Sequence, residues 1–176
     1  MAYMYPKKYF PDIPSEQKVF DVLKGMSDNF HIFHSIKYSN EEDITKEIDF
    51  IIIDVRNGIL FLEVKGGDCK FDEGKFYQIN KGKIISKDPQ KQANDGLHFF
   101  RKRYDEFYSN QGSLSGFKGY FHWGVCTPDK RFDPKDLPAS YPEHSFISAE
   151  YITDSNSDNL EKRIVYMLKK DLNIVF

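Results

Sequence analysis

The chain has 176 residues, of which 40% are hydrophobic and 30% are charged. This length and balance favour a soluble protein with one hydrophobic core, so we expect a single domain over residues 1–176. The net charge of −2 excludes a uniformly basic nucleic-acid-binding protein, and any contact with a polyanion must therefore use a local patch.

Targeting and redox features point to the cytoplasm. The sequence shows no signal peptide, no apolar run long enough to cross a bilayer and no lipidation motif. The two cysteines, Cys69 and Cys126, are far apart and match no metal-ligand spacing, so we interpret them as reduced thiols. We therefore expect a cytoplasmic protein that does not bind a membrane.

The sequence pattern of the first half of the chain predicts a helix followed by strands. Residues 1–13 are expected to form an arm, and Pro14 begins a helix that ends near Gly25. Alternating or continuous apolar residues predict strands at 31–38, 47–55 and 59–65. A small hairpin is predicted from 76–79 and 83–86, whereas the acidic residues around it, Asp68, Asp72 and Glu73, are interpreted as a surface turn.

The second half begins with a long helix. Asp88 and Pro89 are typical of a helix start, and the helix is expected to run to about residue 109. Residues 119–127 predict a buried central strand, 128–143 a proline-rich loop, and 145–149 a short strand. Asp158 and Glu161 form a capping-box pattern before a last helix, which would present Leu160, Ile164, Leu168 and Leu172 on one face. This order predicts an α/β fold with a mixed β-sheet flanked by helices.

Charged residues interrupt the two neighbouring apolar strands at 47–55 and 59–65. Asp49, Glu63 and Lys65 stand where a hydrophobic core would favour Ile or Leu. Burying a charge is costly unless it is paired or binds a metal ion. These positions therefore suggest a site that holds a divalent cation, although Glu63 and Lys65 alone would more often form an exposed ion pair.

The turn between these strands decides whether the two acids share a face. A two-residue loop, Asn57-Gly58, would point Glu63 away from Asp49. A three-residue loop, 56–58, would place Asp49 opposite Lys65 and diagonal to Glu63. The metal-site hypothesis therefore requires the three-residue loop or a bulge of equal effect.

Such a site would offer hard oxygen ligands. The carboxylates of Asp49 and Glu63 and the carbonyl of Val64 suit Mg²⁺ or Mn²⁺. Lys65 could orient a water molecule or offset charge on a phosphate, and Glu16, on the inward face of the first helix, could bind a water. An equally acceptable interpretation of Glu16 is that it complements the helix dipole. Gln92 could position a water or contact a phosphate.

The same residues carry a resemblance to a known family. The stretches Ser15-Glu16, Glu47-Ile48-Asp49-Phe50, 58–67 with its Glu-Val-Lys-Gly-Gly end, and Pro89 followed by Gln92-Ala93 resemble the nuclease-related domain. That family is similar to the PD-(D/E)xK superfamily of restriction endonucleases and Holliday-junction resolvases. The resemblance covers about residues 13–127, and residues 128–176 match no family that we can name.

The resemblance implies a restriction-endonuclease-like fold and Mg²⁺-dependent DNA cleavage. It implies a core of Asp49, Glu63 and Lys65, supported by Glu16 and Gln92, with Glu47 as a candidate accessory acid. Similar domains often accompany helicases, so a helicase or another DNA-processing module is an expected partner besides DNA. The chain itself has no Walker motif.

Other interpretations stay open at this point. Arg101, Lys102 and Arg103 could contact a DNA backbone, although a solvated helix face is the commoner explanation. A kept fold can lose its activity, so a catalytically inactive DNA-binding or protein-interaction module is the main alternative. A hydrolase of RNA or nucleotides is a third, and a homodimer is one way to raise DNA affinity.

Overall fold

The structure is a computed structural model that describes residues 1–9, 12–39, 45–110, 120–153 and 157–170. Its helices are α1 (Pro14–Lys24), α2 (Pro89–Asn110) and α3 (Ser157–Lys170). Its strands are β1 (Tyr3–Tyr5), β2 (Phe30–Ser39), β3 (Thr45–Asp54), β4 (Gly58–Val64), β5 (Asp68–Asp72), β6 (Lys75–Asn80), β7 (Lys83–Lys87), β8 (Tyr120–Thr127) and β9 (Phe146–Ser148). Within these ranges no helix has both the length and the hydrophobicity that crossing a bilayer requires.

Six strands form the main sheet in the order β1-β2-β3-β4-β8-β9. Strands β2, β3 and β4 are antiparallel neighbours, whereas the pairs β1–β2, β4–β8 and β8–β9 are parallel. The remaining strands form a separate antiparallel sheet in the order β5-β6-β7. This arrangement confirms the predicted α/β fold with a mixed sheet.

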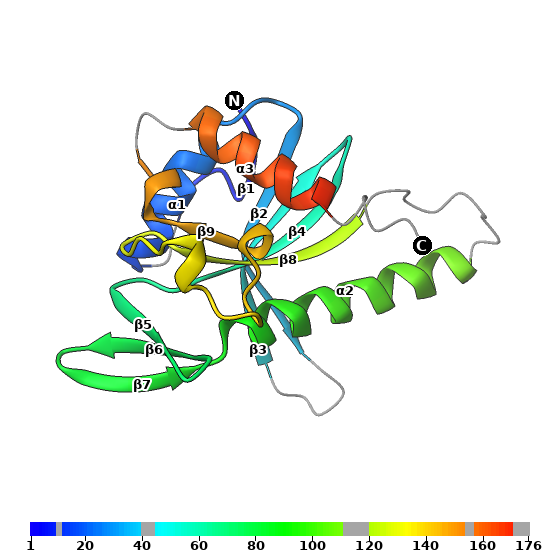
Figure 1. The fold of residues 1–176 in the computed structure, drawn as a ribbon. Coiled ribbons are helices and arrows are strands. Elements are labelled where there is room, and N and C mark those ends of the chain that lie inside the picture. The colour runs from blue at the N-terminus through cyan, green and yellow to red at the C-terminus, as the bar shows by residue number, and fades with distance from the viewer. Residues whose placement is uncertain (10–11, 40–44, 111–119, 154–156, 171–176) are drawn as a thin grey trace.

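Helices cover both faces of the main sheet (Figure 1). Helices α1 and α3 pack on one face and build the larger hydrophobic cluster, which includes Val19, Leu23, Ile52, Leu60, Leu62, Ile164 and Leu168. Helix α2 crosses the other face, where Leu97 packs with Ile51 and Phe61. Gly96 allows this close approach, because a Cβ there would lie 2.6 Å from Cδ1 of Ile48.

The N-terminal arm and the segment after β4 are more ordered than expected. Strand β1 pairs with β2 and extends the main sheet, so part of the arm is a strand. The segment predicted as a surface turn is instead strand β5, joined to β6 by a two-residue turn. Glu73 and Gly74 in that turn have φ of 49° and 75°, the left-handed conformation that two-residue hairpin turns favour.

The predicted capping box at the last helix is wrong in detail. Helix α3 begins at Ser157, so Asp158 lies inside its first turn. The carboxylate of Glu161 does not cap the helix but accepts hydrogen bonds from the backbone N–H and the hydroxyl of Ser27, at 2.8 and 2.9 Å. It thereby ties α3 to the end of α1. Leu172 lies outside the described residues.

Candidate functional site

The turn between β3 and β4 has three residues, Val55 to Asn57, because Asp54 pairs with Gly58. Its length matches the three-residue alternative, but it begins one residue earlier than expected. The last pair of the ladder is Phe50 with Leu62. This register differs by two residues from the predicted one, so the predicted pairing of Asp49 with Lys65 is wrong.

Strict alternation along β3 breaks beside Asp49. Ile48 and Ile51 both pack on the α2 side of the sheet, although residues three apart in a regular strand point to opposite faces. The partner strand is irregular at the same level, since Ser35 has φ of 54° and the pairing of β2 with β3 skips from His34 to Ile36. The irregularity therefore lies at the level of Asp49 on both strands.

The side chain of Asp49 on β3 forms a hydrogen bond with the backbone of β4. Its Oδ2 accepts a hydrogen bond of 2.7 Å from the backbone N–H of Val64, two residues beyond the last ladder pair. A side-chain oxygen thus satisfies a backbone donor at the point where the β3–β4 ladder ends. The hydrogen bond fixes the Asp49 carboxylate next to Glu63, which adjoins Val64 in the chain.

Glu63 and Lys65 form an ion pair at the end of β4. Lys65 Nζ donates to Glu63 Oε1 at 2.5 Å, and the two side chains are 13% and 5% exposed, respectively. The backbone N–H of Lys65 donates to the carbonyl of Cys126 at 2.8 Å, which continues the contact between β4 and β8. The pair is therefore held by the centre of the main sheet.

Glu16 reaches the same place from the first turn of α1. Its side chain is buried, and its Oε2 accepts a hydrogen bond of 2.6 Å from the hydroxyl of Tyr9. Gly66 lets α1 approach the end of β4, because a Cβ at Gly66 would lie 2.2 Å from Ser15 Oγ. Burial and the Tyr9 contact make Glu16 part of the interior.

Burial and repulsion between neighbouring carboxylates raise the pKa of each acid in this cluster. The pKa of Asp49 is raised well above its ordinary value, by burial first and then by the charges of Glu63 and Glu16. Burial also raises the pKa of Glu63, with added repulsion from Glu16 and Glu47, and Lys65 opposes both shifts. The pKa of Glu16 is raised by burial and by Glu47. The cluster thus carries acidic charge that Lys65 only partly compensates.

The side chain of Asp129 contacts the glycine pair that follows Lys65. Asp129, two residues beyond β8, accepts a hydrogen bond of 2.8 Å from the Gly67 N–H and forms an ion pair with Lys18 of α1. Gly67 has φ of 75°, which favours glycine. No sequence pattern predicts that Tyr9 and Asp129 lie here. Only the position of Asp129 just after a parallel strand beside β4 could have suggested it.

The structure does not bring Gln92 to the acids. Gln92 is exposed on the first turn of α2, and among the described residues no hydrogen bond joins it to Glu16, Glu47, Asp49 or Glu63. The helix start itself is as predicted, since Asp88 Oδ1 accepts a hydrogen bond of 2.9 Å from the Lys91 N–H.

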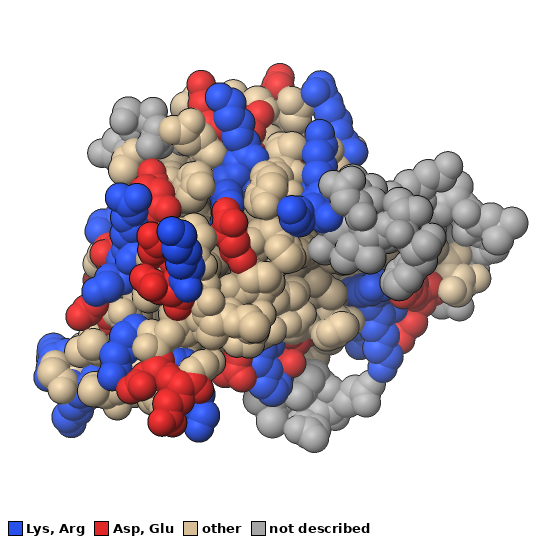
Figure 2. Space-filling view, in the orientation of Figure 1, with Lys and Arg blue, Asp and Glu red and all other residues tan. Residues whose placement is uncertain are grey.

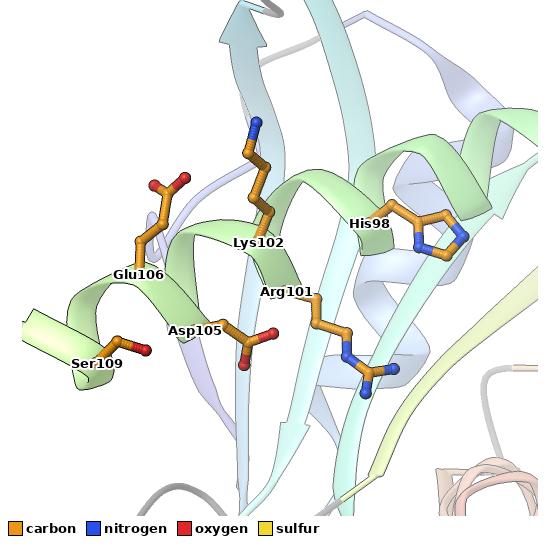
Figure 3. A pocket seen from close by; sticks show the side chains of 6 residues that line it. All are labelled: His98, Arg101, Lys102, Asp105, Glu106 and Ser109. Atoms are coloured by element: carbon orange, nitrogen blue, oxygen red, sulfur yellow. The ribbon is translucent and has the colours of Figure 1, made fainter.

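The basic run of α2 lies on an exposed face that also carries acids. Arg101 and Lys102 line a shallow pocket with His98, Asp105, Glu106 and Ser109, and Figure 3 shows these two basic side chains pointing apart. Arg103 forms an ion pair of 3.2 Å with Glu106. The face therefore has mixed charge.

The donor set of the acidic cluster suits a hard divalent cation. Within the described ranges no group of three or more His, Cys, Asp or Glu side chains is arranged to enclose a metal ion. Mg²⁺, however, is usually bound through one or two carboxylates, with waters and substrate phosphates completing its coordination. Asp49 and Glu63 supply two carboxylates in surroundings that disfavour their negative charge. The residues present therefore fit an open site of that kind.

Comparison with protein families gives one match. The model of the nuclease-related domain matches residues 12–122, a range that contains α1, β2 to β7, α2 and the acidic cluster. Searches of curated proteins and of solved structures gave no match.

Proposed function

Because the chain belongs to the nuclease-related domain family, we propose that it is a metal-dependent nuclease that hydrolyses phosphodiester bonds of DNA. The observation that supports this most directly is the buried acidic cluster at the ends of β3 and β4. The pKa of each of Asp49, Glu63 and Glu16 is raised there, by burial first, and Lys65 lies among them.

The proposed ligands of the cation are the carboxylates of Asp49 and Glu63 and the backbone carbonyl of Val64. Mg²⁺ is the proposed ion, and Mn²⁺ is an acceptable substitute because it takes the same oxygen ligands. When bound, the ion would polarise the scissile phosphate and make a water molecule more acidic.

The side chains around the ligands have separate proposed roles. Lys65, released from Glu63 once that carboxylate binds the cation, would stabilise the charge that develops on the phosphate oxygens. Glu16, oriented by the Tyr9 hydroxyl, would accept a hydrogen bond from the attacking water. Glu47 would add negative charge next to Glu63 and Glu16, and Gln92 would contact a phosphate from the surface of α2.

One observation favours a second candidate function. Lys65 already neutralises Glu63 through a direct ion pair, and a permanent pair of this kind would compete with a cation. The second candidate is therefore a module on the same fold that binds DNA or a protein without cleaving anything. It predicts tight binding with no cleavage at any metal concentration.

A cleavage assay with metal titration separates these functions. Wild-type protein is incubated with supercoiled plasmid, linear duplex, RNA and nucleotides over a range of Mg²⁺ and Mn²⁺ concentrations. DNA cleavage that needs the metal and falls about 10²–10³-fold in Lys65→Met and Asp49→Asn supports the nuclease. Asp158→Asn, the same chemical change on the exposed first turn of α3, should cleave like wild type. Cleavage of RNA or nucleotides alone would reassign the substrate.

The net charge of the chain bears on how tightly it binds DNA without a partner. With a net charge of −2, the protein alone should have modest affinity for DNA. We propose that a helicase, another DNA-processing module or a second copy of the chain supplies additional affinity.

A further inference from the structure

The three-stranded sheet β5–β7, here called the wing, ends in an open edge. Its strand order is β5-β6-β7, so β7 pairs with β6 on one side only. In Figure 1 the wing projects from the body of the protein, with β7 along its outer border. All five residues of β7 are exposed, including Ile84 and Ile85, which are 59% and 41% exposed. A further strand would therefore have room on both faces beside β7.

The turn before β7 determines which of its backbone groups point outward. Asn80 pairs with Lys83 across the two-residue turn 81–82, whose residues have φ of 47° and 77°, as in a type I′ turn. The first residue of such a turn accepts a hydrogen bond from the backbone N–H of the fourth, so Lys83 bonds to β6. Because bonded and non-bonded pairs alternate along an antiparallel ladder, the N–H and C=O groups of Ile84 and Ser86 point away from β6. The edge therefore offers two donors and two acceptors, and no other described segment bonds to them.

The charge of the wing differs in sign from that of the chain. Residues 68–87 contain five lysines and three acidic residues, whereas the whole chain has a net charge of −2. Two of these acids already form ion pairs with lysines. Lys83 and Lys87, at the two ends of β7, have no ion-pair partner in the part of the chain that the structure describes. Figure 2 shows basic side chains at the outer end of the wing, so an incoming strand would meet positive charge there.

This charge decides which kind of strand suits the edge. A second copy that paired antiparallel with β7 over all five residues would set Lys83 opposite Lys87 of that copy, and the reverse. Like charges directly opposite each other destabilise a sheet, whereas opposite charges stabilise it. Lysines on an open edge commonly prevent pairing with another copy. The same two lysines favour a strand with acidic residues at the matching positions, so they exclude one partner and select another.

We propose that β7 binds an extended acidic segment of another protein, which joins the wing as an antiparallel strand. The backbone of this segment would bond to Ile84 and Ser86, and two acidic side chains four residues apart would lie opposite Lys83 and Lys87. An apolar residue midway between the acids would cover Ile85. Such binding requires neither a metal ion nor cleavage, so the docking site and the nuclease can be tested separately.

An NMR titration of the full chain with a synthetic peptide tests the proposal. The probe is the peptide Ser-Glu-Val-Ile-Val-Glu-Ser, and chemical-shift changes in the protein report where it binds. Antiparallel pairing would set its two valines opposite Ile84 and Ser86 and its isoleucine opposite Ile85. N-methylation of one valine removes an N–H that would bond to β7, whereas N-methylation of the isoleucine removes an N–H that would point away. The isoleucine-methylated peptide is therefore the matched control.

Variants of β7 test the charge and the backbone separately. Lys83→Glu/Lys87→Glu reverses the charge, and Lys162→Glu/Lys169→Glu on α3 controls for net charge because both lysines are exposed. Ser86→Pro removes an outward N–H without removing a bond to β6, and proline is tolerated at such edge positions. Ser86→Ala is its control. Thermal unfolding of each variant shows whether the fold is kept.

Wild type should bind the peptide with shifts centred on β7, and either valine methylation or Ser86→Pro should weaken binding about tenfold. The charge-reversed wing should lose the acidic peptide and bind a peptide in which lysines replace the glutamates. Absence of binding at millimolar concentration, shifts away from β7, an equal loss in the α3 control or equal effects of the two methylations would overturn the proposal. So would a charge-reversed wing that loses binding to a DNA duplex but keeps binding to the peptide.

Discussion

The Asp49 carboxylate accepts a 2.7 Å hydrogen bond from the backbone N–H of Val64, so an acid of the candidate site also satisfies the backbone of the adjacent strand. This contact holds the carboxylate in place where the ladder between β3 and β4 ends. The same residue thus carries a structural role, which an amide can share, and a charge, which an amide lacks. The two roles can be separated by substitution.

Asp49→Asn should stabilise the metal-free protein at neutral pH. The Asn oxygen still accepts from the Val64 N–H, while the buried negative charge is removed. Because the folded-state pKa of Asp49 is raised, ionisation opposes folding at all pH values above the usual carboxyl range. Urea unfolding in EDTA at pH 7.5 should show a gain of about 1–2 kcal/mol. The gain should disappear below about pH 3, where both states of the wild type are protonated.

Mg²⁺ should reverse that order of stability. A cation that binds the folded wild type raises its free energy of unfolding, by about 2.7 kcal/mol at a hundredfold excess over Kd, so the melting temperature rises with the Mg²⁺ concentration. Asp49→Asn and Glu63→Gln should show a much smaller shift, and Asp158→Asn should match wild type. Equal shifts in all four proteins would place the binding of Mg²⁺ elsewhere on the molecule.

Gly66→Ala should destabilise the protein and impair the site. An added Cβ would lie 2.2 Å from Ser15 Oγ and 2.3 Å from Ser15 Cβ, so α1 must move away from β4. Overpacking of this kind costs about 1–3 kcal/mol. Denaturant unfolding measures the loss. The double variant Gly66→Ala/Ser15→Gly removes the clashing atoms and should recover most of it, and failure to recover would mean that another contact opposes the methyl group.

Asp95→Asn should destabilise the protein only at pH values above the range in which carboxyl groups usually titrate. Burial alone would raise the pKa of Asp95, but hydrogen bonds from Lys46 on β3 and Lys91 on α2 outweigh it and lower the pKa. The lowered pKa adds stability that is present above the usual Asp value and lost as the pH falls through the folded value. At pH 7 the variant should lose about 0.5–1 kcal/mol, because the groups are partly exposed. The difference from wild type should vanish near pH 2, and a constant difference would contradict the electrostatic explanation.

Glu161→Ala should weaken the attachment of α3 to the end of α1. The substitution removes the two hydrogen bonds that Glu161 accepts from Ser27. Losing hydrogen bonds to a charged acceptor costs about 1.5–3 kcal/mol. The melting temperature should fall by several degrees, whereas Lys162→Ala, at an exposed neighbouring position, should leave it nearly unchanged. Similar effects of the two substitutions would indicate lost helix packing in place of lost hydrogen bonds.

The position of the β3–β4 turn shows why register was hard to predict. The Asn57-Gly58 dipeptide suggested a glycine inside the turn, where it often adopts positive φ. In the structure Gly58 is the first residue of β4, and a Cβ there would lie 2.4 Å from the carbonyl oxygen of Tyr120. The glycine is therefore required by the approach of β8, a strand more than sixty residues away. The residues around Gly58 in the sequence do not indicate that β8 packs against it.

Hydrophobic spacing by itself determined the three helices, most strands of the main sheet and the presence of charges inside apolar strands, because these depend on neighbours along the chain. Tertiary structure decided which charges meet. It brought Glu16 and Tyr9 to the end of β4 and left Gln92 exposed. It also placed the β5–β7 sheet beside the cluster, through the hydrogen bond of Gln78 to Gly66. Contacts between segments far apart in sequence are selected by the packing of the whole domain, and a local pattern cannot specify them.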